Sequence, residues 1–182
     1  MLIFLIKIFL GDDFMIYNKE QIDLYLKKME YNDEIKIDYE TLCKLQIAHL
    51  THIPYENIDV LNRKPISLEA QDLFDKMIVK QRGGYCFELN GLYSNLLKSL
   101  GFDVTNLAGR FIYQDGNTRM RLHRILKIDI DNKSYISDVG VLSELSRKSL
   151  ELEAGKVQND GKCDYKFEYN PKQEGEYILY QR

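Results

Sequence analysis

The spacing of apolar residues changes at Gly101, and this change sets the fold class. Before it, apolar side chains recur at intervals of three and four residues, most clearly from Leu89 to Leu100, which predicts helices. After it, short runs rich in β-branched and aromatic residues predict strands. We therefore expect an α+β chain, with a helical domain at residues 15–101 and a β-rich domain at residues 102–182.

Local signals divide each half into elements. Polar capping residues mark where helices begin, and Pro or Gly marks where they end. These signals predict four helices, of which the first covers residues 19–29 and the last is the most regular. The residues that mark helix starts are Asn18, Asp38 and Ser67, and Gln21 completes a capping box with Asn18. The residues that mark helix ends are Pro54, Gly83 and Gly101. The strand-like runs are 102–113, 122–130, 133–141, 165–169 and 176–180.

The first ten residues, MLIFLIKIFL, are almost all apolar. This run is too short to span a bilayer, and it has neither the basic start nor the small-residue cleavage site of a signal peptide. We expect residues 1–14 to be an upstream extension and Met15 to be the natural start. The alternative is a weak anchor to a membrane surface.

The charge balance and the cysteine content argue against several classes. The chain has 25 Lys and Arg against 28 Asp and Glu, a net charge of −3, so it lacks the basic excess that nucleic-acid binding needs. Its three cysteines form neither a disulfide framework nor a CxxC metal motif. We therefore expect a cytoplasmic protein that has no metal and binds neither nucleic acid nor membrane.

Cys86 is the first candidate nucleophile. It follows Gly83 and Gly84 and precedes the regular helix, which puts it at or near a helix N-terminus. Unpaired N–H groups and the helix dipole there favour an anion, and so favour the thiolate. The two glycines allow a tight turn and a close approach of substrate. The alternative is a buried, inert cysteine, which is the common state of a free thiol.

A thiolate nucleophile needs a base, and the base needs an acceptor that orients it. Two of the three histidines end a predicted helix, whereas His123 lies in a strand run. A turn at Asp131-Asn132 would make Asp138 the diagonal neighbour of His123 on one face, while a three-residue loop would put the two on opposite faces. The spacing thus allows a Cys86–His123–Asp138 triad. A strand histidine and a hairpin aspartate with purely structural roles are the alternative.

One segment is far more specific than this spacing. Residues 82–90, Arg-Gly-Gly-Tyr-Cys-Phe-Glu-Leu-Asn, closely resemble the nucleophile motif of the arylamine N-acetyltransferase family. The segments IPYENIDV and PISL before it, and LHR and YISDVG after it, resemble further motifs of that family in the same order. The resemblance extends from about Met15 to about Gly140.

The resemblance implies a fold and a reaction. The fold would be a helical bundle followed by a barrel-like β domain, related to papain-like cysteine enzymes. Cys86 would attack the thioester of acetyl-CoA, His123 would shuttle the proton, and Asp138 would hold the imidazole. The acetyl group would rest on Cys86 and then pass to an arylamine or hydrazine, which gives ping-pong kinetics. The Cys86 backbone N–H would be an oxyanion donor.

The same resemblance implies roles for residues around the triad. Arg82 would pair with Glu56 and Asp59 and so brace the loop beneath the nucleophile. Arg119 and Leu122 would line the cleft that takes CoA or the acceptor.

Two departures from the family pattern leave alternatives open. The aspartate strand continues Gly140-Val141-Leu142 where the family has Gly-Phe-Gly, so an aromatic is missing from the rim of the site. We also expect most of the family's third, C-terminal domain to be absent. The alternatives are a cysteine hydrolase or amidase on the same triad, a truncated non-catalytic member, and an amide synthase that uses a tethered acyl donor. The sequence leaves open the acceptor amine, the acyl group and the oligomeric state.

Overall fold

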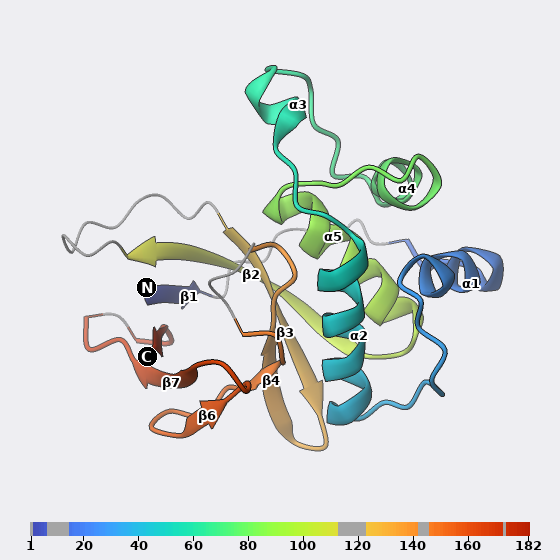
Figure 1. Ribbon diagram of the computed structural model, residues 1–182. Helices are drawn as coiled ribbons and strands as arrows, with labels where there is room; N and C mark the ends of the chain where they lie inside the picture. The colour runs from blue at the N-terminus through green and yellow to red at the C-terminus, as the bar shows by residue number, and fades with distance from the viewer. Residues whose placement is uncertain (1, 7–14, 113–122, 142–145, 173) are drawn as a thin grey trace.

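The computed structural model describes residues 2–6, 15–112, 123–141, 146–172 and 174–182. The helices fill one side of the molecule and the strands fill the other (Figure 1). This arrangement confirms the predicted α+β class.

The four predicted helices are present, and their capping contacts follow the sequence signals. Asn18 Oδ1 accepts from the Gln21 N–H at 2.9 Å, and Asp38 Oδ1 accepts from the Thr41 N–H at 2.8 Å. Gly101 follows the last helix with a φ of +99°, which glycine adopts without steric cost. The helices are α1 (Lys19–Lys28), α2 (Tyr39–His52), α3 (Ile58–Leu61), α4 (Ala70–Phe74), η1 (Asp75–Val79) and α5 (Cys86–Ser99).

The third predicted helix differs in detail from the expectation. Its N-cap is Glu69 rather than Ser67, whose Oγ instead accepts from the Glu69 N–H at 3.2 Å. After α4 the helix continues as η1, a π-helical turn, in which Met77 and Ile78 are buried. The short helix α3, in the loop after α2, was not predicted.

The strands form one antiparallel sheet in the order β5-β4-β3-β2-β1-β8-β7-β6. Its edge strands, β5 and β6, approach each other through Gln158, whose side chain accepts from the Glu151 N–H at 2.7 Å and donates to the Glu151 carbonyl at 2.8 Å. Backbone pairing ends at these two strands, so a closed barrel stays a prediction. The strands are β1 (Leu2–Ile6), β2 (Asp103–Ile112), β3 (His123–Ile130), β4 (Lys133–Ser137), β5 (Leu150–Glu151), β6 (Val157–Asn159), β7 (Asp164–Tyr169) and β8 (Tyr177–Gln181).

Strand β1 lies in a segment for which no strand was predicted. Residues 1–14 were expected to be an upstream extension, and in the structure Leu2–Ile6 pair with β2 on one side and with β8 on the other. A short, unbroken apolar run is consistent with a strand inside a sheet, but its periodicity alone does not identify one. That Met15 is the natural start stays a prediction.

Two groups of buried apolar side chains hold the fold together. The larger group lies between the helices and the sheet, and includes Leu42 from α2, Leu92 from α5 and Leu126 from β3. The smaller group lies in the β half and includes Ile125 from β3 and Phe167 from β7. Ile125 and Leu126 are neighbours on β3 but belong to different groups, so this strand is buried on both faces. Its burial fixes the position of its first residue, His123.

Within the described residues, the structure contains no helix with the length and apolar character that a membrane span requires.

Candidate active site

Cys86 is the first residue of α5, and the two glycines before it determine its position. The Gly84 carbonyl accepts from the Glu56 N–H at 3.0 Å, so the segment leading into α5 pairs with the loop after α2. A Cβ on Gly83 would collide with the carbonyl of Pro54. The glycines therefore let two loops pack closely, and Cys86 lies at the positive end of the dipole of α5.

The β3–β4 hairpin has the register of a two-residue turn rather than that of a three-residue loop. Ile130 pairs with Lys133 across the two-residue turn Asp131–Asn132, whose φ values of +49° and +62° are those of a type I′ turn. This register brings Asp138 to His123, and His123 Nε2 forms a hydrogen bond with Asp138 Oδ2. Both side chains are buried.

The three predicted side chains meet at this point. Burial lowers the pKa of the His123 imidazole, but the charge and hydrogen bond of Asp138, together with a hydrogen bond to Cys86, outweigh burial and raise that pKa above its ordinary value of 6.5. Because Nε2 faces Asp138, Nδ1 is the ring nitrogen left for the thiol. The arrangement favours an imidazolium beside Cys86, which in turn favours the thiolate.

Asn90 belongs to the same site, although the sequence analysis gave it no role. It lies one helical turn after Cys86 on α5, and its Nδ2 donates to Asp138 Oδ1 at 2.8 Å and to the Arg124 carbonyl at 2.6 Å. Its Oδ1 accepts from the Val139 N–H at 3.0 Å. Asn90 therefore holds the ends of β3 and β4 against the helix that carries the nucleophile. Its place four residues after the cysteine was the available signal.

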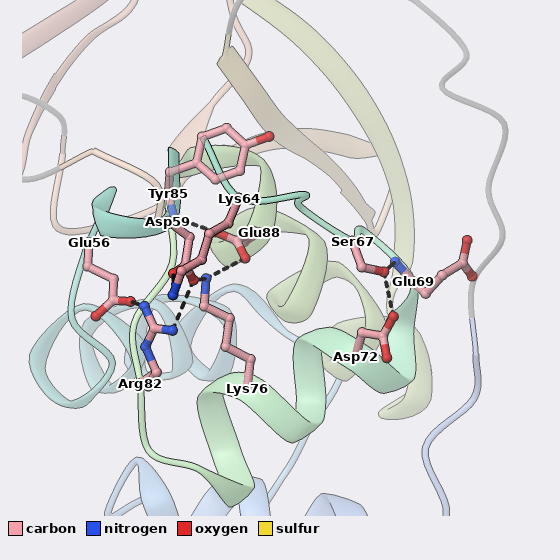
Figure 2. A network of polar contacts seen from close by, with 10 residues as sticks. All are labelled: Glu56, Asp59, Lys64, Ser67, Glu69, Asp72, Lys76, Arg82, Tyr85 and Glu88. Carbon is pink, nitrogen blue, oxygen red and sulfur yellow. Dashed lines mark hydrogen bonds and ion pairs between the residues drawn. The ribbon is translucent and has the colours of Figure 1, made fainter. Parts of the chain in front are cut away.

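The predicted pairing of Arg82 is also present. Its guanidinium forms ion pairs with Glu56 and, at 3.0 Å, with Asp59 (Figure 2). Lys76 from η1 extends this network, since its Nζ lies 3.0 Å from Asp59 Oδ2 and 2.8 Å from Glu88 Oε1. Neither Lys76 nor Glu88 was given a role from the sequence. Figure 2 shows the network next to Tyr85, the residue that precedes α5.

The two predicted CoA-cleft residues, Arg119 and Leu122, lie outside the described residues. Their role stays a prediction.

The remaining histidines and cysteines lie away from these contacts. His49 is fully buried in the helical half, where burial lowers its pKa to about 3, and His52 Nδ1 lies 2.9 Å from the Ala48 carbonyl. Cys43 is buried in α2, and Cys163 lies between β6 and β7. Within the described ranges, no three His, Cys, Asp or Glu side chains are grouped so that they could hold a metal ion.

Comparison with known proteins gives a consistent result. The model of the N-acetyltransferase family matches residues 38–182. The arylamine N-acetyltransferase / N-hydroxyarylamine O-acetyltransferase of Salmonella typhimurium is 38% identical over 128 residues, which are 70% of this chain and 46% of that protein. The arylamine N-acetyltransferase of Escherichia coli is 32% identical over 143 residues, which are 78% of this chain and 51% of that protein. The chain thus spans about half the length of these curated relatives.

Solved structures agree with the sequence matches. The arylamine N-acetyltransferase of Salmonella typhimurium superposes with a TM-score of 0.83 at 32% identity, over 91% of this chain and 60% of that one. The Mycobacterium marinum enzyme in complex with CoA superposes with a TM-score of 0.78 at 30% identity, over 88% of this chain and 64% of that one. From its fold, its motifs and these matches, the chain belongs to the arylamine N-acetyltransferase family.

Proposed function

We propose that this protein transfers an acetyl group from acetyl-CoA to an arylamine or hydrazine, through an acetyl group held on Cys86. The observation that carries the proposal is the contact among Cys86, His123 and Asp138 at the N-terminus of α5. The names of the relatives and the CoA complex of one of them supply the donor and the acceptor class.

In the first half of the reaction, the Cys86 thiolate attacks the carbonyl carbon of acetyl-CoA. The bond between that carbon and the CoA sulfur breaks, and CoA leaves as a thiol with the proton that His123 held. The Cys86 backbone N–H, at the first position of α5, is the donor for the oxyanion that forms.

In the second half, the amine nitrogen attacks the acetyl carbon on Cys86. The bond from that carbon to Cys86 Sγ breaks, and the amine proton passes to His123, which restores the thiolate and imidazolium. Asp138 keeps the imidazole in one orientation and stabilises its charged form throughout.

Further parts of this proposal come from the composition and periodicity of the sequence and from the family resemblance. They are a barrel-like closure of the β half, a papain-like relationship of the fold, a cytoplasmic location, and contacts of Arg119 and Leu122 with CoA or the acceptor. The division into residues 15–101 and 102–182 belongs here too, with the nucleophile in the first part and its partners in the second.

The test is the intact mass of the purified protein after mixing with acetyl-CoA, with Cys86→Ser as the control. We expect a gain of one acetyl group that the control does not show. The acetylated protein is then freed of acetyl-CoA and divided between buffer and buffer with an arylamine. Loss of the acetyl group only in the amine supports the transferase, whereas equal loss in buffer identifies a hydrolase. A folded protein that gains no acetyl group contradicts the proposal.

A further inference from the structure

Glu88 places a buried negative charge next to the nucleophile. It lies two residues after Cys86 in the first turn of α5, and its side chain is 3% exposed. Its Oε2 accepts from the Tyr85 N–H at 3.1 Å, so the carboxylate caps the helix that begins at Cys86. A carboxylate here stabilises the helix, but its charge also opposes a thiolate in the same turn.

Lys76 supplies the opposite charge from a different element. Its Nζ, on η1, lies 2.8 Å from Glu88 Oε1 and 3.0 Å from Asp59 Oδ2, and its side chain is 17% exposed (Figure 2). Burial lowers the pKa of Lys76, but the hydrogen bonds to Glu88 and Asp59 outweigh burial and raise that pKa above its ordinary value. Lys76 therefore remains a cation across the pH range in which a thiol titrates.

The charges of the surrounding network alternate and balance. Glu56, Asp59 and Glu88 provide three negative charges, and Lys64, Lys76 and Arg82 provide three positive charges. Within this network, Lys76 is the cation that contacts Glu88, the carboxylate on the helix of the nucleophile. Lys64 contacts Asp59, at 3.4 Å, and its side chain is 62% exposed.

We propose that Lys76 is a positioning residue for the Cys86 thiolate. It neutralises Glu88, so that Glu88 can cap α5 without repelling the negative charge on Cys86. The inference rests on the proposed role of Cys86 as the nucleophile, and Lys76 acts through Glu88 rather than by touching a substrate. Within the described residues, the titratable groups that interact with Cys86 include His123 from β3 and Tyr55 and Tyr85 from the adjoining loops, and Glu88 lies two residues farther along its own helix.

The test measures alkylation of Cys86 by iodoacetamide across pH, followed on the Cys86 peptide by mass spectrometry. In Lys76→Met we expect alkylation at pH 7 to slow by about tenfold and its midpoint to move to higher pH, because the Glu88 charge is no longer balanced. The double variant Lys76→Met/Glu88→Gln should return to within about twofold of the parent, since glutamine still caps the helix without a charge.

Lys64→Met is the matched control, because it removes a lysine from the same network at its exposed end. It should alkylate at the parent rate. A purely structural role of Lys76 predicts an unchanged pH midpoint and no rescue by Glu88→Gln, and either result would overturn the proposal.

Should Lys76→Met fail to fold, Glu88→Gln alone decides. It leaves Lys76 without its nearest partner charge, so alkylation of Cys86 should move to lower pH, and an unchanged midpoint or a move to higher pH contradicts the inference. The experiment uses no acetyl-CoA. A protein that is never acetylated would therefore contradict the proposed function while this test still reports on Lys76.

Discussion

Gly140 lies directly against the backbone of Cys86: a Cβ on Gly140 would stand 2.8 Å from the Cys86 Cα and 2.6 Å from Asn90 Nδ2. The loop after β4 can approach the nucleophile this closely only because residue 140 has no side chain. The same loop carries Asp138, whose Oδ1 accepts from the Gly140 N–H at 2.8 Å. The approach of Gly140 to Cys86 therefore also sets how far Asp138 lies from the nucleophile helix.

Gly140→Ala should damage the site more than the fold. The added methyl group forces the loop away from α5, which we expect to cost about 1–3 kcal/mol of unfolding free energy and to slow acetylation of Cys86 by about 100-fold. Urea unfolding and the intact-mass assay measure the two effects. Val141→Ala, at the next position, is the control and should acetylate at the parent rate. Parent-like acetylation of Gly140→Ala would show that the close approach is not needed.

Asn90→Ala should lower both stability and acetylation. It leaves the Val139 N–H without its buried partner and removes one of the two donors to Asp138 Oδ1, at a cost of about 1–3 kcal/mol. Asn95→Ala is the matched control, because Asn95 is a buried asparagine on the same helix that bonds Tyr17 instead. We expect the control to lose stability and to keep its acetylation rate, measured as above. Equal acetylation by both variants would remove Asn90 from the site.

Asp138→Asn should change how stability depends on pH. In the folded protein the pKa of His123 lies above 6.5. The contribution of the His123–Asp138 pair to the unfolding free energy is therefore full below pH 6.5, and it is lost as the pH rises through the folded pKa of His123. The variant lacks this contribution, so its unfolding free energy should fall less than that of the parent between pH 6.5 and pH 10. Acetylation should drop by about 10⁴-fold, as when the orienting carboxylate of a triad is lost. Parallel pH profiles for the two proteins would contradict the assignment.

His49→Phe should protect the fold against acid. Burial lowers the pKa of His49 to about 3, so between pH 6.5 and pH 3 the unfolded chain binds a proton that the folded chain does not. Stability from this residue is therefore full above pH 6.5 and falls by about 2 kcal/mol between pH 6.5 and pH 5. The variant should lose that much less in urea unfolding at the two pH values. His52→Asn, at a partly exposed histidine, should behave like the parent.

Local signals predicted much of the fold and the central contact of the site. Asn18 and Asp38 cap helices as expected, because a capping contact involves residues only three positions apart. The partner of His123 could be predicted because a two-residue turn fixes which residues of a hairpin face each other. The motif at residues 82–90 then singled out Cys86.

The parts that the sequence did not predict depend on distant segments. Strand β1 pairs with β2 and β8, which follow it in the sequence by about a hundred residues or more. Its apolar run also lacks the alternation of apolar and polar residues that marks a half-buried strand. Lys76 and Asn90 look like ordinary helix residues in the sequence. Their partners lie on other elements, at Asp59 and at Asp138, and only the folded chain brings them together.

Because the turn Asp131–Asn132 has only two residues, the alignment of His123 with Asp138 depends on the length of the β3–β4 hairpin as much as on the identity of these two residues. His123 and Asp138 are 15 positions apart, and adding or removing one residue so that β4 shifts by one place would turn Asp138 to the opposite face of the strand. The apolar composition of the hairpin would hardly change, yet the histidine would lose its carboxylate. Among descendants of this gene, single-codon insertions and deletions between these two positions should therefore be eliminated more strictly than most substitutions there.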